Sequence, residues 1–163
     1  MSRLDSFIRR MQAQRDCLNW AAAAIAAVPG PVLEIGLGNG RTYDHLRERL
    51  PDRDIYVFDR RVAAHPGCIP PDDRLFLGEV AETLPRAAAR LGRSAALVHS
   101  DLGTGDDAAN AELARAVAPR LADLVRPGGI VVANHAMAVD TWAPLPEPPG
   151  VKPGRYFLYR AAA

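Results

Sequence analysis

VLEIGLGNGRT, residues 32–42, runs from an apolar segment into three glycines at alternate positions. A short apolar run that ends in glycines predicts a buried strand that turns sharply into a helix. Glycine has no Cβ, so Gly36, Gly38 and Gly40 allow positive φ values and a close approach of a ligand to the main chain. Glu34 stands inside the apolar run just before them. The stretch therefore predicts a ligand-binding turn at the end of a strand.

Helix-like and strand-like segments alternate on both sides of this turn. We expect helices over residues 3–28, 41–50, 83–92 and 106–125, and strands over 31–36, 54–59, 74–79, 94–101 and, after a turn, within 127–136. This alternation is typical of a doubly wound, Rossmann-like α/β fold, with a mostly parallel sheet and helices on both faces. Pro85 is expected in the first turn of its helix, and Pro119 is expected to kink or split the helix that contains it.

The last part of the chain differs in composition. Residues 137–155 are rich in proline and glycine, and residues 155–160 (RYFLYR) predict a final strand. Another crossover helix does not fit there, so we expect an antiparallel C-terminal strand and a sheet of six or seven strands. The expected organisation is a single domain, 1–163, with an N-terminal helix in 1–30, a core in 31–134, and a Pro-rich tail and last strand in 135–163.

Composition excludes several classes of partner. The chain has 163 residues and a net charge of +1, which gives no general attraction to nucleic acid or to anionic membranes. No apolar run is long enough to cross a bilayer, and the first residues lack the pattern of a secretory signal. Cys17 and Cys68 are far apart and without ligand-like neighbours, so we expect free thiols in a reducing cytoplasm.

The glycine spacing argues against a dinucleotide cofactor. The dinucleotide fingerprint G-x-G-x-x-G requires a last glycine for close packing of the helix, and Arg41 stands at that position. Asp59 ends the second predicted strand 19 positions after Gly40. A carboxylate at that place can accept hydrogen bonds from both hydroxyls of a ribose. A carboxylate-rich pocket also suits a ligand that has no phosphates and carries positive charge.

Taken in order, these residues resemble the class I S-adenosylmethionine-dependent methyltransferases. E-x-G-x-G-x-G followed by a strand that ends in Asp is similar to the first part of the family pattern. FLGEV (76–80), LVHSD (97–101) and LVRPGGIVV (124–132) resemble the later motifs in the right order. The resemblance spans about residues 31–134 and points to a compact bacterial member without a substrate-recognition domain.

The resemblance implies that S-adenosyl-L-methionine binds at the carboxyl edge of the sheet and gives a methyl group to an O, N or C nucleophile of a small-molecule acceptor. The implied cofactor-binding residues are Glu34, Gly36, Leu37, Gly38, Asn39, Gly40, Thr42, Asp59, Arg60, Gly78, Glu79, Val80 and Ser100. Asp101 and His135 are the candidate catalytic residues. His99 is either a hydrogen-bonded core residue or a catalytic one.

A metal site is not expected. In the catechol-type O-methyltransferases that the segment after the fifth strand resembles, an Asp and an Asp-Asn pair hold a divalent cation. Asp101 and Asn134 match that set, but Ala133 replaces the second Asp. The loss of one carboxylate weakens a site made of oxygen ligands for a hard cation.

Three other functions stay open at this point. The chain could be a non-catalytic module that binds S-adenosyl-L-methionine, a nicotinamide-dependent oxidoreductase, or an aminopropyl transferase that uses the decarboxylated cofactor. Homo-oligomerisation is compatible with the N-terminal helix and the short tail. Acceptor specificity is expected in that helix, in residues 102–107 and in the tail, none of which carries a motif that names a substrate.

Overall fold

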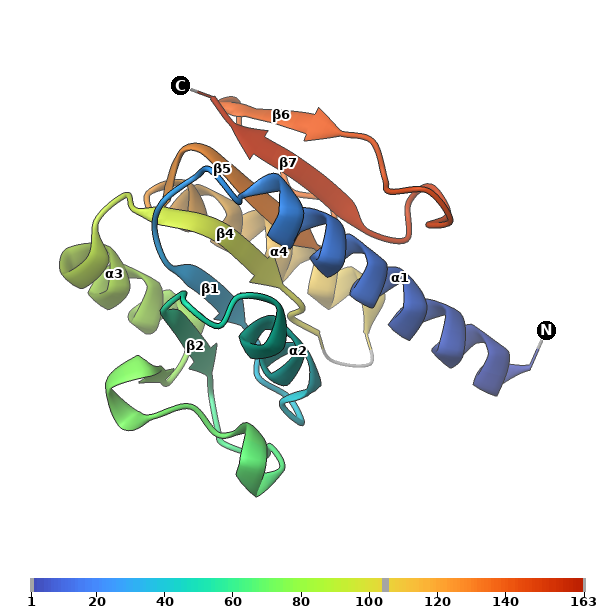
Figure 1. Ribbon diagram of the computed structural model, residues 1–163, viewed down its shortest axis with the longest axis horizontal. Coiled ribbons are helices and arrows are strands. Elements are labelled where there is room, and N and C mark those ends of the chain that lie inside the picture. Colours follow the sequence, from blue (N-terminus) through green and yellow to red (C-terminus); the bar gives the residue numbers. More distant parts are fainter. Residues whose placement is uncertain (1, 104–105, 163) are drawn as a thin grey trace.

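The computed structural model describes residues 2–103 and 106–162, and there seven strands form one sheet (Figure 1). The sheet has the order β3-β2-β1-β4-β5-β7-β6. The strands are β1 (Val32–Ile35), β2 (Ile55–Asp59), β3 (Leu75–Leu77), β4 (Ala95–Ser100), β5 (Val125–Ala133), β6 (Trp142–Leu145) and β7 (Phe157–Ala161). The helices are α1 (Arg3–Ala24), α2 (Arg41–Arg49), α3 (Val80–Leu91) and α4 (Asp107–Ala122), with short 3-10 turns η1 (Pro66–Cys68) and η2 (Asp72–Arg74).

Strands β1 to β5 are parallel to one another, whereas β7 runs antiparallel to both β5 and β6. This confirms the doubly wound, mostly parallel sheet with an antiparallel C-terminal strand. The order of β1 and β4 at the centre matters for function. In such sheets the crossover direction reverses between the two central strands, which leaves a crevice at their carboxyl ends.

Helices cover both faces of the sheet. Because side chains alternate along a strand, Val32 packs in a cluster with residues of α1 and α2, whereas Leu33 packs in a second cluster with residues of α3 and α4. Both side chains are fully buried, as expected for a parallel strand that is covered on both sides.

Helix α1 ends at Ala24, four residues before the expected end at Val28. Residues 25–28 form tighter turns, and their carbonyl groups need partners other than the next helical N–H. Arg53 supplies them, since its guanidinium donates to the carbonyl oxygens of Ile25 at 2.9 Å, Val28 at 2.7 Å and Gly30 at 2.8 Å. Pro29 cannot donate to the carbonyl group of Ile25, so Arg53 caps this end of the helix from far along the chain.

Helix α3 begins at Val80, earlier than the expected start at residue 83, so Pro85 lies inside the helix and not in its first turn. A proline there cannot donate to the carbonyl one turn back, and Arg120 of α4 donates to that carbonyl of Ala81 at 3.4 Å. Pro119 does not split α4, which continues to Ala122.

Strand β5 begins before the Pro-Gly-Gly turn that was expected to precede it. Its register against β4 shifts between Ala95 and Leu97, where Val125 and Ile130 are the partners. The extra residues of β5 form an irregularity that keeps the turn within the strand. In the described part of the chain, no helix is both long and apolar enough to cross a membrane.

Candidate functional site

The carboxyl ends of the central strands bring the polar residues of the motifs together. Gly36 follows β1, Asp59 ends β2, Asp101 follows β4, and Asn134 follows β5. Because these four strands are parallel, their carboxyl ends meet at one edge of the sheet. The structure therefore brings these predicted site residues together at one edge of the sheet.

The glycine turn needs its first glycine for a close approach between strands. Gly36 has φ +99°, and a Cβ there would lie 2.9 Å from the carbonyl oxygen of Asp101. Gly38 has φ +52°, and a Cβ there would meet no atom within 4 Å. The space above Gly38 is therefore open for a ligand to approach the main chain.

Asp59 fixes the shape of this turn. Its Oδ2 accepts hydrogen bonds from the backbone N–H groups of Leu37 at 2.9 Å and Gly38 at 3.1 Å, and its Oδ1 accepts one from Arg61 at 3.2 Å. The carboxylate is half-buried and faces the turn, not bulk water. The end of β2 thus positions the turn after β1.

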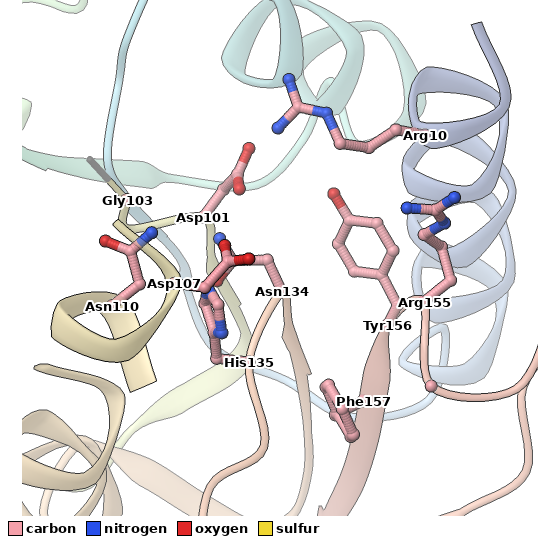
Figure 2. Close-up of a pocket in the computed structure, with 11 residues that line it drawn as sticks. Arg10, Asp101, Gly103, Asp107, Asn110, Asn134, His135, Arg155, Tyr156 and Phe157 are labelled. Atoms are coloured by element: carbon pink, nitrogen blue, oxygen red, sulfur yellow. The ribbon is translucent and has the colours of Figure 1, made fainter. Parts of the chain in front are cut away.

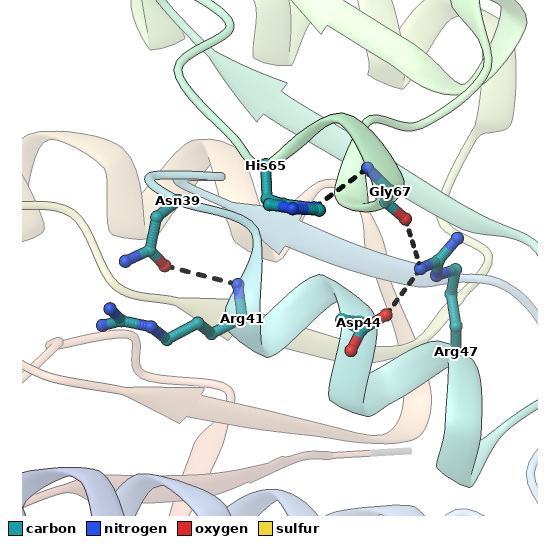
Figure 3. A network of polar contacts seen from close by, with 6 residues as sticks. All are labelled: Asn39, Arg41, Asp44, Arg47, His65 and Gly67. Atoms are coloured by element: carbon teal, nitrogen blue, oxygen red, sulfur yellow. Dashed lines mark hydrogen bonds and ion pairs between the residues drawn. The ribbon is translucent and has the colours of Figure 1, made fainter.

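Gly40 has a packing role. It has φ +86°, and a Cβ there would lie 2.4 Å from the Cβ of Cys68 in η1. Figure 3 shows how η1 is held against α2: Arg47 donates to the carbonyl oxygen of Gly67 at 2.8 Å and to Asp44 at 2.6 Å. Gly40 therefore packs against η1, and the carbonyl oxygen of its neighbour Asn39 accepts a hydrogen bond from the backbone N–H of His65 at 3.2 Å.

A cavity of about 210 Å³, the glycine-turn cavity, opens beside the turn. Its lining residues are Gly36, Gly38, Phe58, Asp59, Arg60, Glu79, Val80, Asp101, Leu102, Gly103 and Leu113. A carboxylate for sugar hydroxyls, apolar side chains for a flat base and bare glycine backbone occur together in this set. This combination of groups fits an adenosine bound at the edge of the sheet.

The predicted cofactor-binding residues divide into two groups. Those that line the glycine-turn cavity are Gly36, Gly38, Asp59, Arg60, Glu79 and Val80. Those outside its lining are Glu34, Leu37, Asn39, Gly40, Thr42, Gly78 and Ser100. Residues outside the lining can still contact residues that line the cavity. Gly78, for example, donates its N–H to the carbonyl oxygen of Asp59 at 2.9 Å.

The side chain of Glu34 connects α2, which follows the glycine turn, with β4. It is fully buried, accepts a hydrogen bond from the Thr42 hydroxyl, and lies 2.7 Å from Nδ1 of the equally buried His99. Burial alone would lower the pKa of His99, but the charge and hydrogen bond of Glu34, with Asp101 nearby, raise it above its usual value. His99 is thus a core histidine in an ion pair.

A second cavity of about 690 Å³, the β5–β7 cavity, lies on the other side of Asp101 (Figure 2). Its lining residues are Arg10, Asp101, Gly103, Asp107, Asn110, Asn134, His135, Gly154, Arg155, Tyr156 and Phe157. Asp101 and Gly103 line both cavities. Both candidate catalytic residues, Asp101 and His135, border the β5–β7 cavity.

Comparison with known proteins gives this arrangement a family. Residues 1–161 match the profile of the family described as S-adenosyl-L-methionine methyltransferase. The chain belongs to this family. A crystal structure of an S-adenosyl-L-methionine methyl transferase from Silicibacter pomeroyi DSS-3 is 47% identical, with a TM-score of 0.95 over 99% of both chains. No curated protein sequence matches the chain.

More distant structures share the fold of this methyltransferase. Human methyltransferase-like protein 13, in complex with SAH, is 12% identical with a TM-score of 0.58 over 94% of this chain and 81% of that one. The antibiotic-resistance methyltransferase Kmr is 16% identical with a TM-score of 0.52 over 86% of this chain and 90% of that one.

The expected family, enzyme class and cofactor are therefore confirmed. The protein is a methyltransferase that uses S-adenosyl-L-methionine. The nicotinamide alternative, against which Arg41 already argued, does not hold, and neither do the non-catalytic module and the aminopropyl transferase.

Asn134 of the methyltransferase has a structural contact in place of a metal-binding role. Its side-chain amide donates to the carbonyl oxygen of Leu102 at 2.9 Å and so connects β5 to the segment after β4. Ala133 is fully buried. Among the described residues, no group of three or more His, Cys, Asp or Glu side chains could hold a metal ion. A metal-free reaction stays a prediction.

Four residues of the methyltransferase site lie outside the sequence motifs. Gln14 of α1 donates to Oδ2 of Asp101 at 2.7 Å, while Arg10, Arg155 and Tyr156 line the β5–β7 cavity. No local signal marks these residues, because only the packing of α1 and β7 beside β4 and β5 brings them to the site. Of the segment 102–107, where acceptor specificity is expected, Thr104 and Gly105 lie outside the described residues.

Proposed function

We propose that this methyltransferase acts on a small-molecule acceptor bound in the β5–β7 cavity, with the cofactor in the glycine-turn cavity. The observation that carries the proposal is that Asp101 and Gly103 line both cavities. A reacting atom in one cavity can therefore reach a reacting atom in the other beside Asp101. A volume of about 690 Å³ is within the range of small-molecule sites.

Asp59 and the glycine turn would hold the cofactor. The Asp59 carboxylate accepts the ribose hydroxyls, while the bare backbone at Gly36 and Gly38 admits the methionine part. Val80 and Leu102 provide an apolar contact for the adenine. When bound, S-adenosyl-L-methionine supplies a methyl group that its positively charged sulfur has already activated. Holding two reactants in line in this way contributes about 7–11 kcal/mol to lowering a barrier.

Asp101 would act on the acceptor. Its Oδ2 is occupied by Gln14, which leaves Oδ1 to orient the nucleophile and to accept a proton where the nucleophile must lose one. General-base catalysis of this kind contributes about 10²–10⁴-fold. His135, which borders only the β5–β7 cavity, is the second candidate base.

The net charge and the free thiols support a proposal for the class of acceptor and for the cellular compartment. The net charge of +1 supports an acceptor other than nucleic acid. Cys17 and Cys68 are free, as expected in a bacterial cytoplasm, and burial raises the pKa of Cys17 to about 12. We treat residues 1–163 as one methyltransferase domain, which could form a homo-oligomer.

Methyl transfer from radiolabelled S-adenosyl-L-methionine tests the proposal. The purified protein is incubated with separated small-molecule, RNA, DNA and protein fractions of bacterial cells. We expect label in the small-molecule fraction, and we expect Asp101→Asn to reduce it by about 10²-fold or more even at saturating S-adenosyl-L-methionine. Label in a macromolecular fraction, or in none, would contradict the proposal.

A further inference from the structure

Two arginines line the β5–β7 cavity on the side of α1. Arg10 comes from α1 and Arg155 from the segment just before β7, and both line the cavity. Figure 2 shows Arg155 beside α1, away from Asp101 and Asp107, and the side chain of Arg10 extending from α1 toward Asp101. Among the residues that the structure describes, neither guanidinium forms a salt bridge, and the guanidinium carbon of Arg10 lies 5.8 Å from the ring centroid of Phe7. Both positive charges are therefore available to a ligand.

Tyr156 adds a buried donor to these charges. Its side chain is 1% exposed, and its hydroxyl has no hydrogen-bond partner within the described part of the chain. Figure 2 shows this hydroxyl pointing into the space between Asp101 and Arg10. Buried polar groups nearly always have a partner, so an orphan hydroxyl beside a cavity indicates a ligand atom that completes it.

The hydroxyl of Tyr156 is a donor at neutral pH. Burial raises its pKa well above the ordinary value, and the negative charge of Asp101 raises it further, while Arg10 has a smaller opposite effect. A neutral phenol can give a hydrogen bond to an anionic oxygen. It therefore complements the two guanidinium groups.

We infer that the acceptor carries a carboxylate or phosphate group, which Arg10 and Arg155 bind and to which Tyr156 donates a hydrogen bond. Guanidinium groups match the planar oxygens of carboxylates and phosphates. Asp101 and Asp107 enter the cavity from the ends of β4 and α4 and repel an anion, so the acceptor is oriented with its anionic end at the arginines and its nucleophile at Asp101. This inference rests on the proposed function, since it assigns the substrate class of the same cavity.

Binding of small aromatic probes tests this inference. Benzoate, phenyl phosphate and the neutral benzamide are titrated into the protein with and without saturating SAH, and binding is followed by NMR or calorimetry. We expect at least one anion to bind about ten-fold or more tightly than benzamide. The tighter of the two anions tells whether the site prefers a carboxylate or a phosphate.

Variants test whether the anion binds at the arginines of the cavity and not through the overall charge of the protein. Arg10→Gln and Arg155→Gln are each expected to weaken the anion about ten-fold and to leave benzamide unchanged, whereas Arg3→Gln, on the same helix but outside the cavity, changes neither. Tyr156→Phe keeps the buried ring and is expected to weaken the anion several-fold.

Equal binding of anion and benzamide, or no effect of either arginine variant, would overturn the inference. If the natural protein did not bind SAH, that result would contradict the proposed function instead. Because the anion titration is also made without SAH, the two failures are read separately.

Discussion

Gln14 in α1 donates a 2.7 Å hydrogen bond to Oδ2 of Asp101, 87 residues away at the end of β4. The Gln14 side chain is 5% exposed, so this contact is protected from competing water. It fixes one oxygen of the carboxylate that lines both cavities. The N-terminal helix thus sets the orientation of the residue at the centre of the site.

Gln14→Leu is expected to reduce the rate of methyl transfer about ten-fold, because Asp101 loses its fixed orientation while keeping its charge. SAH affinity should change little, since Gln14 does not line the glycine-turn cavity. Gln12→Leu, an exposed change on the same helix, is the control. An unchanged rate in Gln14→Leu, measured by transfer of labelled methyl, would show that Asp101 needs no positioning by α1.

Gly38→Ala is expected to weaken SAH binding about ten-fold or more, because the new methyl group occupies the open space above the turn. Gly128→Ala is the matched control: both glycines have positive φ, and a Cβ at either would meet no atom within 4 Å, but Gly128 lies near the start of β5, outside the site. Both variants should lose about 1–2 kcal/mol of stability. Equal SAH affinity in the two, by calorimetry, would argue against binding at the turn.

Arg53→Met is expected to lower the free energy of unfolding by about 2 kcal/mol, because three backbone carbonyl groups after α1 lose a charged donor. Arg49→Met, an exposed change nearby on α2, should stay within about 0.5 kcal/mol of the natural protein. Denaturant unfolding measures both. If the two variants were equally stable, the carbonyl groups would have to find equivalent partners without Arg53.

The buried pair of Glu34 and His99 predicts a dependence of stability on pH. The pKa of folded His99 is raised above its unfolded value of about 6.5, so its contribution is fully present below that pH and is lost as pH rises through the folded value. The destabilisation of His99→Gln should therefore be largest near about pH 6 and shrink at higher pH, by at most about 1.4 kcal/mol per pH unit. A difference that does not change up to about pH 9 would contradict the raised pKa.

Local patterns predicted the fold because each depends on neighbours in the sequence. The apolar run before Gly36 and the acid after Phe58 predict a strand, a turn and a ribose-binding edge without tertiary information. Helix ends were less predictable. Pro29 disfavours helix at Val28, and the partners of the freed carbonyl groups could not be predicted, because they come from Arg53, far along the chain.

The candidate site shows the same division. Gly36, Gly38 and Asp59 line their cavity where the motifs predict. Gln14 and Tyr156 could not be predicted, because nothing within a helix or a final strand says which residue will lie beside Asp101. Their places depend on α1 packing over the sheet and on β7 pairing with β5.

A crystal structure with bound SAH tests the central claim most directly. The account predicts that the ribose hydroxyls lie at Asp59 and that the sulfur lies beside Asp101, facing the β5–β7 cavity. SAH with its ribose away from Asp59, or with its sulfur closed off from that cavity, would contradict the account.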